Sequence, residues 1–494
     1  MKRRDFLSMT VGAAAMAGTR PAFATPRQTG PIGANNRIRA ALIGAGGRGG
    51  AVARDWQLNK DSVFVATCDV DAGRITGTGN GSATTLAGRQ EGLKVDGYEE
   101  YRRILDRNDV DAVLIGTPDH WHSQMCIDAM SAGKDIYCEK PISNNVEAAV
   151  KMRDAARKSN RIIQIGTQQR SWPHFQEAAK LFHDGTIGTA RHVVMMPPSA
   201  GGQGGGGPIQ GLTAAQMPAE PIPAGFNWDL FQGPAEKKPF LQARRGWRGW
   251  YAYGGGSITD WGVHLVDVMA WLMQLDNKVP NLTSASAQYV NQVKDPERTP
   301  GTFSVTWQYD TFIANLTNAV LPGTGQAEEN YGNWFYAQRA VLLVNRFGYD
   351  IRPFGLAPGR GGRAAGAPGG APGAGAPAAG APAAGAAAPA QGAAAPAGGG
   401  GGRGGRGGGA AAGPALPPLE PKRVWDPDGR NEAAGTKFAQ ATVSHVRNFL
   451  DCVRSRQQPV CNMEAGFAAS IPCILANQAI REERTLKFDG NKAT

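Results

Sequence analysis

Two separated groups of polar residues carry side chains that could remove a proton from a hydroxyl group. Asp260 and His264 lie four positions apart, so both side chains would share one face at the start of a helix. A histidine oriented by a carboxylate is a suitable base for a hydroxyl proton. Lys140, within Glu139-Lys140-Pro141, could stabilise the negative charge that develops on the oxygen. These side chains could therefore prepare a carbinol carbon to lose a hydride.

A glycine-rich stretch near the N-terminus could supply the hydride acceptor. The apolar run from Ile38 to Ile43 leads into Gly44-Ala-Gly46-Gly-Arg-Gly49, the G-x-G-x-x-G arrangement of dinucleotide sites. Gly44 would allow the tight turn, and Gly46 would let the backbone approach the pyrophosphate. Gly49 would let the helix that begins near Arg48 pack on the strand, with its first amides facing the phosphates.

Asp69 closes the next apolar run, twenty residues after Gly49. At that distance a carboxylate would accept hydrogen bonds from the adenosine ribose. Its charge would repel a 2′-phosphate, so the sequence favours NAD over NADP as cofactor. Arg74, five residues further on, could instead hold that phosphate.

A metal ion would be another use for these residues, because Asp260, His264 and Asp267 are all possible ligands. We expect none here, since a nicotinamide would already supply the electrophile. His264 could also be a core histidine with satisfied hydrogen bonds, and Glu139-Lys140-Pro141 could be an ordinary surface turn.

The elements that must position these residues alternate between strands and helices from Ile38 to Ile165. That alternation predicts an α/β Rossmann domain, a doubly wound parallel sheet with its ligand loops at the carboxyl ends of the strands. We expect strands at 38–43, 62–68, 110–115, 135–138 and 161–165. We expect helices at 98–107 and 123–130, and one running from an Asn144 cap to about Lys158.

After Arg191 the apolar runs become longer and more β-rich, which predicts an α+β C-terminal domain with a mostly antiparallel open sheet. The expected strands lie at 191–195, 282–290, 303–309, 311–318 and 340–344, and the expected helices at 438–454 and 464–483. Residues 355–419 consist almost entirely of Gly, Ala and Pro, which predicts a disordered insertion. The predicted domains are therefore 36–166 for the Rossmann domain, and 167–354 with 420–494 for the C-terminal domain.

The first 24 residues read as a signal peptide. Arg3-Arg4-Asp5-Phe6-Leu7 matches the twin-arginine pattern, and a short apolar run leads to Ala22-Phe23-Ala24, after which we expect cleavage. The apolar run is too short to span a bilayer. We therefore expect a periplasmic or secreted protein without a membrane anchor after cleavage.

The formal net charge of +11 does not indicate a nucleic-acid partner. Seven of these excess positive charges lie in residues 1–24 and 355–419, and the remaining body is only weakly basic. Among the six cysteines, Cys68 and Cys138 lie in apolar runs typical of a core. Cys452 and Cys461 could form a disulfide in an oxidising compartment.

The glycine loop, Thr117-Pro118 with His122, Glu139-Lys140-Pro141 and Asp260-x-x-x-His264 together resemble the glucose-fructose oxidoreductase and inositol dehydrogenase family (Gfo/Idh/MocA). The resemblance runs from about Ile38 to Lys487. The leader and Thr167-Gln-Gln-Arg170 resemble the exported twin-arginine branch of the family. The resemblance implies an NAD(P)-dependent oxidoreductase of carbohydrate metabolism that forms a homo-oligomer.

The resemblance also implies roles for individual residues. Lys140 would lie between nicotinamide and substrate, His264 would be the acid/base, and Asp260 would contact or orient the substrate. Gln168 and Arg170 would border the substrate. The residues expected to line the cofactor come from the glycine loop and three strand ends: Gly44, Gly46, Arg48, Gly49, Asp69, Thr117, Pro118, His122 and Glu139.

These observations predict an exported enzyme that oxidises a sugar, polyol or glycoside hydroxyl by hydride transfer. Because no dependable pool of NAD exists outside the cytoplasm, we expect the cofactor to stay tightly bound. One alternative is an NAD-dependent glycoside hydrolase, lyase or epimerase that works through a transient keto-sugar. A second alternative is a sugar-binding protein without catalytic activity. The aromatic side chains Trp228, Trp247, Trp250 and Trp261 could either stack on a sugar or serve packing.

Overall fold

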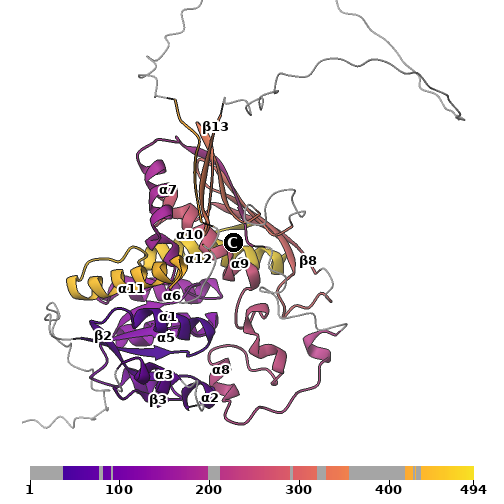
Figure 1. Cartoon of the computed structure of the whole chain (residues 1–494). Helices are drawn as coiled ribbons and strands as arrows, with labels where there is room; N and C mark the ends of the chain where they lie inside the picture. The colour runs from indigo at the N-terminus through magenta and orange to yellow at the C-terminus, as the bar shows by residue number, and fades with distance from the viewer. Residues whose placement is uncertain are drawn as a thin grey trace, which may run out of the picture. The chain divides into compact units, whose positions relative to one another are not determined.

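The computed structural model describes residues 37–76, 82–90, 93–198, 212–289, 293–319, 330–354, 418–426, 429 and 435–494. The described residues up to Pro353 and from Glu420 onward belong to one unit, which holds every feature below (Figure 1). The predicted signal peptide at 1–24 lies outside the described residues, as does nearly all of the predicted insertion at 355–419.

The N-terminal part is built on six parallel strands in the order β3-β2-β1-β4-β5-β6. Successive residues of β1 contact opposite layers: Ala40 and Leu42 pack on one core cluster, and Ala41 and Ile43 on the other. Both faces of the sheet are therefore buried, which explains the continuous apolar strands. The strands are β1 (Ile38–Ile43), β2 (Ser62–Cys68), β3 (Asp96–Tyr98), β4 (Ala112–Ile115), β5 (Asp135–Cys138) and β6 (Ile163–Ile165).

The helices of this part are α1 (Gly47–Trp56), α2 (Ala72–Thr76), α3 (Ser82–Gly88), α4 (Arg102–Leu105), α5 (Asp119–Ser131) and α6 (Val146–Lys158). The predicted helix at 98–107 is present only as the short α4, because Tyr98 pairs with Cys68 in the sheet. The predicted helix at 123–130 begins four residues earlier, directly after Pro118. Asn145, and not Asn144, caps α6 by accepting a hydrogen bond from the Ala148 amide at 2.9 Å.

The second sheet has nine strands in the order β14-β13-β12-β11-β7-β10-β9-β8-β15. Its neighbours are antiparallel except for β7 and β10, so the predicted fold class is confirmed for both sheets. The strands are β7 (Ala190–Met196), β8 (Leu282–Gln288), β9 (Thr302–Gln308), β10 (Ile313–Thr317), β11 (Gly332–Ala337), β12 (Ala340–Asn345), β13 (Gly348–Pro353), β14 (Lys422–Trp425) and β15 (Leu486–Lys487). Strands β11, β13, β14 and β15 were not predicted from the sequence, because polar and turn-forming residues break their alternation.

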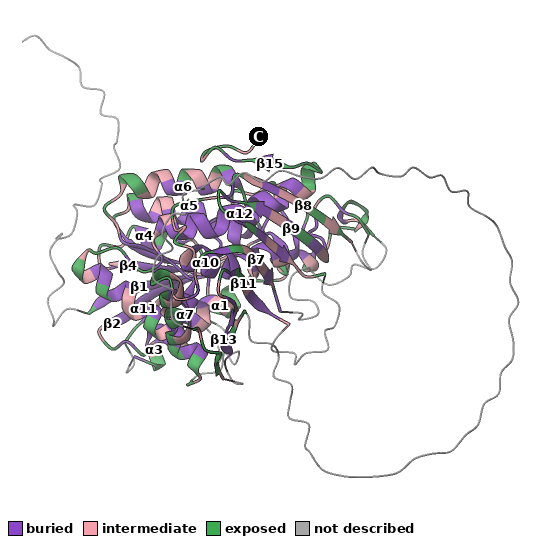
Figure 2. Ribbon diagram, turned by 90° about the horizontal axis from the view of Figure 1, so that it is seen from above, coloured by how far each residue is buried: buried purple, intermediate pink, exposed green. Residues whose placement is uncertain are grey.

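Two C-terminal helices pack against the first sheet although they follow the second in sequence. α11 (Lys437–Ser455) joins the core cluster that contains α1, and α12 (Met463–Glu482) joins the one that contains α5 and α6. α12 also contacts α10 and β8 (Figures 1 and 2). The remaining helices are α7 (Pro173–His183), α8 (Trp228–Gln232), α9 (Gly256–Asp260) and α10 (Gly262–Leu272).

All six cysteines are buried and free, so the possible Cys452–Cys461 disulfide is not formed. Among the described residues, no helix is both long and apolar enough to cross a membrane.

Candidate active site

A cleft of about 490 Å³ lies at the carboxyl ends of the parallel strands. The loops after β1, β2, β4 and β5 form one part of its lining, and α9, α10 and a Trp-rich loop form another. We name its two parts by their residues. The glycine end comprises Gly44–Gly49 and Asp69, and the lysine end comprises Lys140, Asp260 and His264.

The glycines of the loop meet the geometric demands that the motif predicts. Gly44 has a φ of +87°, and a Cβ on Gly49 would lie 2.0 Å from the Gly44 carbonyl oxygen. A Cβ on Gly46 would lie 3.0 Å from Nη1 of Arg74, inside the cleft. Gly46 precedes α1 as its N-cap and provides no side-chain cap, and the first turn of α1 has no acidic residue. Its first amides therefore remain available for the phosphates of a dinucleotide.

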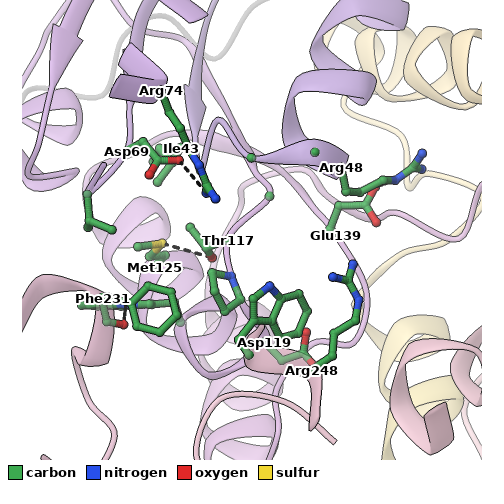
Figure 3. A pocket seen from close by; sticks show the side chains of 18 of the residues that line it. Ile43, Arg48, Asp69, Arg74, Thr117, Asp119, Met125, Glu139, Phe231 and Arg248 are labelled. Carbon is green, nitrogen blue, oxygen red and sulfur yellow. Dashed lines mark hydrogen bonds and ion pairs between the residues drawn. The ribbon is translucent and has the colours of Figure 1, made fainter. Parts of the chain in front are cut away.

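Asp69 is buried at the end of β2, and both of its carboxylate oxygens accept backbone hydrogen bonds. Oδ2 accepts from the Ala45 amide at 2.9 Å, and Oδ1 accepts from the Asp71 amide at 3.0 Å. Arg74 lies close by, with Nη1 3.6 Å from Oδ2 of Asp69 (Figure 3). Burial raises the pKa of Asp69, and the charge of Arg74 opposes that shift. Asp69 thus holds the glycine loop in place and marks the adenosine part of the cleft.

A segment from beyond the first sheet clasps this part of the cleft. The Asn227 amide donates to the Val70 carbonyl and the Ala72 amide donates to the Gly225 carbonyl, both at 2.8 Å. Arg245 forms an ion pair with Asp71 at 2.7 Å, and its guanidinium stacks 4.6 Å from the ring centre of Phe226. We call residues 225–227 together with Arg245 the clasp.

Thr117 and Pro118, which follow β4, line the cleft as predicted for cofactor-binding residues. His122 does not line it. Its ring is buried, with nitrogens 2.5 Å from the Pro141 carbonyl oxygen and 2.9 Å from the Thr117 carbonyl oxygen. Burial lowers the pKa of His122 to about 4, and the two carbonyl contacts oppose that shift. The ring is therefore neutral at pH 7 and donates to only one of the two carbonyls. His122 therefore positions the loops of the cleft instead of contacting a ligand.

Glu139 follows β5 and is almost fully buried in the wall of the cleft. Its Oε1 accepts from Nε of Arg48 at 3.0 Å, whereas its buried Oε2 has no hydrogen-bond partner among the described residues (Figure 3). An unpartnered buried carboxylate oxygen fits a hydroxyl donor such as that of a ribose. This oxygen, the uncapped start of α1 and the space beside Gly46 together fit a dinucleotide.

At the lysine end, Asp260 connects two cations. Nζ of Lys140 donates to Oδ1 of Asp260 at 2.8 Å and to its backbone carbonyl at 2.6 Å. Nε of Arg248 donates to Oδ2 of Asp260 at 3.2 Å. Burial alone would raise the pKa of Asp260, but the two cations outweigh it and lower that pKa. The Asp260 carboxylate is therefore ionised and holds the Lys140 ammonium in the cleft.

His264 also lines the lysine end, one turn into the helical region after Asp260. A break at Trp261 separates α9 from α10, so the two residues lie on successive helices and not on one continuous helix as predicted. Neither ring nitrogen has a hydrogen-bond partner among the described residues, so no carboxylate orients this histidine. Burial, with the nearby charges of Lys140 and Arg346, holds the pKa of His264 well below its usual range. The imidazole is neutral and has an open proton-accepting nitrogen.

The two predicted substrate residues after β6 lie in different places. Gln168 lines the cleft. Arg170 is buried away from it and forms ion pairs with Asp267 at 2.8 Å and Asp276 at 2.6 Å. The structure contradicts a substrate contact for Arg170, because α10 brings the Asp267 carboxylate to its guanidinium. The possible metal set of Asp260, His264 and Asp267 is separated for the same reason.

Several cleft residues were absent from the predicted site. Asp119, at the start of α5, is buried in the lining, and burial raises its pKa well above the usual range. Its position directly after Thr117-Pro118 could have revealed it. Arg248 and Arg346 come from a loop and a hairpin tip and carry no sequence signal. Of the four tryptophans considered, Trp247 and Trp261 line the cleft, whereas Trp228 and Trp250 pack in an aromatic cluster.

Fold and site together define a two-domain protein whose Rossmann domain provides a cleft that fits a dinucleotide. The model of the oxidoreductase family with an NAD-binding Rossmann fold matches residues 38–167. The model of the family's C-terminal alpha/beta domain matches residues 209–311. The chain belongs to the Gfo/Idh/MocA oxidoreductase family, and its N-terminal domain is an NAD-binding Rossmann domain.

Individual relatives match over part of their length. Inositol 2-dehydrogenase of Klebsiella pneumoniae is 29% identical over 153 residues, which cover 31% of this chain and 43% of the relative. A glycosyl hydrolase family 109 protein of Saccharopolyspora erythraea is 28% identical over 182 residues, which cover 36% of this chain and 39% of the relative. The matched segments thus span about two fifths of these relatives.

Solved structures share the fold over most of the chain. A levoglucosan dehydrogenase in complex with NADH and levoglucosan superimposes with a TM-score of 0.57. The match covers 92% of this chain and 100% of that protein, at 13% identity. An aldose-aldose oxidoreductase of Caulobacter crescentus complexed with glycerol gives a TM-score of 0.53 at 16% identity, covering 92% and 100% of the two chains.

Proposed function

We propose that the protein is an NAD-dependent oxidoreductase that acts on a hydroxyl group of a sugar, polyol or glycoside. One observation carries the proposal: the Lys140 ammonium, the Asp260 carboxylate and the neutral His264 line the same cleft as the glycine loop. The similarity to inositol 2-dehydrogenase supports the substrate class. When bound, NAD supplies a hydride acceptor at the carbinol carbon.

The residues of the lysine end divide the remaining work. The Lys140 ammonium, held by Asp260, donates a hydrogen bond to the reacting hydroxyl oxygen and stabilises its developing negative charge. The neutral imidazole of His264 takes the hydroxyl proton on an unpartnered ring nitrogen. Trp247 and Trp261 line the cleft and help to exclude water.

The test uses the purified protein with the nucleotide that it retains. Mass spectrometry identifies that nucleotide, and sugars and polyols are then added while nicotinamide absorbance is followed. Reduction of NAD that depends on a carbohydrate supports the proposal. Tight carbohydrate binding without any absorbance change would instead indicate a sugar-binding protein.

The proposal includes a tightly held cofactor. The clasp supports this, because its two backbone hydrogen bonds and the Arg245–Asp71 ion pair lie over the adenosine part of the cleft. In an Arg245→Gln variant we expect less NAD to co-purify per protein chain than in the wild type. Arg157→Gln is the matched control, because Arg157 also pairs with a carboxylate, at 2.7 Å, but outside the cleft. Equal NAD content in all three proteins would contradict tight retention by the clasp.

The proposal also places the protein in the periplasm or outside the cell. Arg3-Arg4-Asp5-Phe6-Leu7 at the start of the leader supports export by the twin-arginine route. Cell fractionation of the wild type and of a variant with Arg3→Lys and Arg4→Lys tests it. We expect the variant to remain in the cytoplasm, and an unchanged distribution would contradict this route.

Self-association through the second sheet is the last part of the proposal. Ile313 and Tyr336 both pair with His192 in register, so the three side chains form a row across β10, β7 and β11. Ile313 and Tyr336 are 47% and 42% exposed. A partly apolar sheet face that is open to solvent suits contact with a second copy. Light scattering of the wild type and of an Ile313→Lys variant tests this, and identical monomeric masses would contradict it.

An NAD-dependent glycoside hydrolase is the second candidate, favoured by the similarity to a glycosyl hydrolase family 109 protein. In that chemistry a transient ketone acidifies the neighbouring C–H bond and the aglycone leaves by elimination. Water then adds to the resulting double bond, and the hydride returns to the ketone. Release of an aglycone from a glycoside without net NADH formation would favour this candidate. Net NADH formation would favour the dehydrogenase.

A further inference from the structure

The lysine end carries more positive than negative charge. Lys140 and Arg248 share the single carboxylate of Asp260, and His264 beside them is neutral. Asp119 also lines the cleft, and burial raises the pKa of its carboxyl group well above the usual range. The Arg248 side chain is 43% exposed, so its charge is open to solvent and to an anionic ligand that enters the cleft.

Arg248 presents its charge to the cleft. Nε is occupied by Asp260 at 3.2 Å, and the guanidinium stacks on Trp247 at 4.5 Å from the ring centre. Within the described residues, its two Nη atoms form no hydrogen bond. In Figure 3 this side chain extends toward the part of the cleft that holds Glu139. The fixed fork of a guanidinium with two free nitrogens matches the two oxygens of an anionic group.

A second arginine, Arg346, lies near the same region because it contacts Trp261, the residue after Asp260. Arg346, at the tip of the β12–β13 hairpin, stacks 4.4 Å from the ring centre of Trp261 and lines the cleft. The Trp261 ring centre lies 6.0 Å from that of His264. The charge of Arg346 is among the causes that lower the pKa of His264. The two arginines therefore contact the consecutive residues Asp260 and Trp261 at the α9–α10 junction.

We propose that the substrate is an acidic sugar whose anionic group binds Arg248, with Arg346 adding to the attraction. This inference rests on the proposed function and narrows its substrate class. The preferred group is a carboxylate, as in a uronic acid. Sugar phosphates provide the same anionic oxygen chemistry and are a separate arm of the test.

The alternative is that Arg248 only stabilises the charge that develops on the reacting oxygen. The two roles differ in their dependence on the substrate. A binding role for Arg248 affects acidic sugars selectively, whereas a role toward the reacting oxygen affects neutral and acidic sugars equally.

The experiment measures kcat/KM of the NAD-loaded enzyme for D-glucuronate and D-galacturonate, for the parent hexoses, and for a hexose phosphate. We expect the wild type to prefer the uronates over the parent hexoses. In Arg248→Gln we expect kcat/KM for the uronates to fall about 10- to 100-fold, the cost of one charge-assisted hydrogen bond. The hexose values should fall less than the uronate values, because loss of the Arg248–Asp260 contact affects both kinds of sugar and loss of the anion contact affects only the uronates. Arg248→Lys should recover part of the selective loss. A stronger preference for the phosphate would assign the site to phosphorylated sugars.

Thermal shift of the same proteins by each sugar provides a readout that does not need turnover. Arg157→Gln is again the matched control. Equal kcat/KM for uronates and hexoses in the wild type, or an equal loss for both in Arg248→Gln, would overturn the inference while leaving the proposed function intact. If no sugar is oxidised, the proposed function fails, and the inference is then decided by whether the uronates still raise the melting temperature in an Arg248-dependent way.

Discussion

The glycine end and the lysine end of the cleft are assembled in opposite ways. The glycine end comes from one continuous stretch, Gly44 to Asp69, and presents mainly backbone amides. The lysine end collects side chains from separate elements, after β5 for Lys140 and from α9 and α10 for Asp260 and His264. The glycine end forms wherever the strand, turn and helix start of this stretch form. The lysine end forms only when the whole chain is folded.

The two ends also differ in how their charged side chains are held in place. At the glycine end, Asp69 is fixed by two backbone amides, so its position depends on few other side chains. At the lysine end, Lys140, Asp260 and Arg248 hold one another, and each loses a partner when another is removed. Variants at the two ends should therefore affect different kinetic parameters.

The largest effect is expected for Lys140→Met, which tests whether the lysine end performs the chemistry. Removing the ammonium should lower kcat by about 10²- to 10⁴-fold, because the reacting oxygen loses its charge stabilisation. NADH affinity should remain near the wild-type value, since the glycine end is unchanged. Steady-state turnover measures kcat, and quenching of protein fluorescence measures NADH affinity.

Lys151→Met is the control for Lys140→Met, because Lys151 is exposed on α6. Near-normal kcat in Lys140→Met would exclude Lys140 from the mechanism. A parallel loss of NADH affinity would show that the two ends are not separate.

His122 connects the two ends, because its ring lies between the Thr117 and Pro141 carbonyls. Its pKa is about 4 in the folded protein, against about 6.5 in the unfolded chain. As pH falls from 7 to 5, the unfolded state gains a proton and the folded state does not, so stability is lost. This histidine should remove about 2 kcal/mol over that range.

Urea unfolding of the wild type and of His122→Gln at pH 7 and pH 5 measures this contribution. His120, His174 and His445 also have pKa values lowered to about 4 by burial, and they remain in both proteins. The difference in pH dependence between the two proteins is therefore due to His122. Identical pH dependence in both would contradict a neutral buried ring at this position.

A third prediction tests how rigid the glycine end is. In Gly49→Ala the new Cβ would lie 2.0 Å from the Gly44 carbonyl oxygen, so the loop must shift. Overpacking of this kind costs about 1–3 kcal/mol, which corresponds to roughly 5- to 150-fold weaker NADH binding if it falls on the bound geometry. Gly50→Ala is the control, because its Cβ meets only the Ala45 carbonyl at 3.6 Å. Unchanged NADH affinity in Gly49→Ala would show that the loop is not held as tightly as the structure indicates.

The contrast between the glycine end and the lysine end also determines how much of the site could be predicted from the sequence. The parallel sheet, the glycine loop and Asp69 follow from local spacing, because each depends on neighbours within about one βαβ unit. Lys140, Asp260 and His264 were candidates by residue type and spacing, and the family resemblance assigned their roles, but only the structure shows them in one cleft. Their mutual contacts, such as the one between Lys140 and Asp260, join residues that are 120 positions apart.

Arg170 and Arg248 show why the remainder could not be predicted. Both are arginines in short 3-10 helices, Gln168–Ser171 and Trp247–Gly249, with no local signal for what they face. The fold pairs Arg170 with Asp267 and Asp276 in the core, and it places Arg248 in the cleft beside Asp260. Which arginine meets a ligand depends on where α9 and α10 lie, and no pattern around either residue encodes that.

The smallest effect is expected for the choice between NAD and NADP, set at the glycine end by Asp69 and Arg74. Asp69→Asn keeps the acceptor oxygen for a backbone amide but removes the charge that lies 3.6 Å from Nη1 of Arg74. Arg74 is about half exposed, so the interaction is worth about 1 kcal/mol, or somewhat less than a tenfold change in affinity. The guanidinium of Arg74 would then bind a 2′-phosphate more readily.

We expect the ratio of NADPH to NADH affinity to rise in Asp69→Asn and to fall below the wild-type ratio in Arg74→Gln. Affinities of the nucleotide-free protein for both cofactors measure this, and kcat for the preferred sugar should stay constant. A ratio that does not respond to either variant would mean that the two backbone hydrogen bonds, and not the carboxylate charge, are the whole role of Asp69.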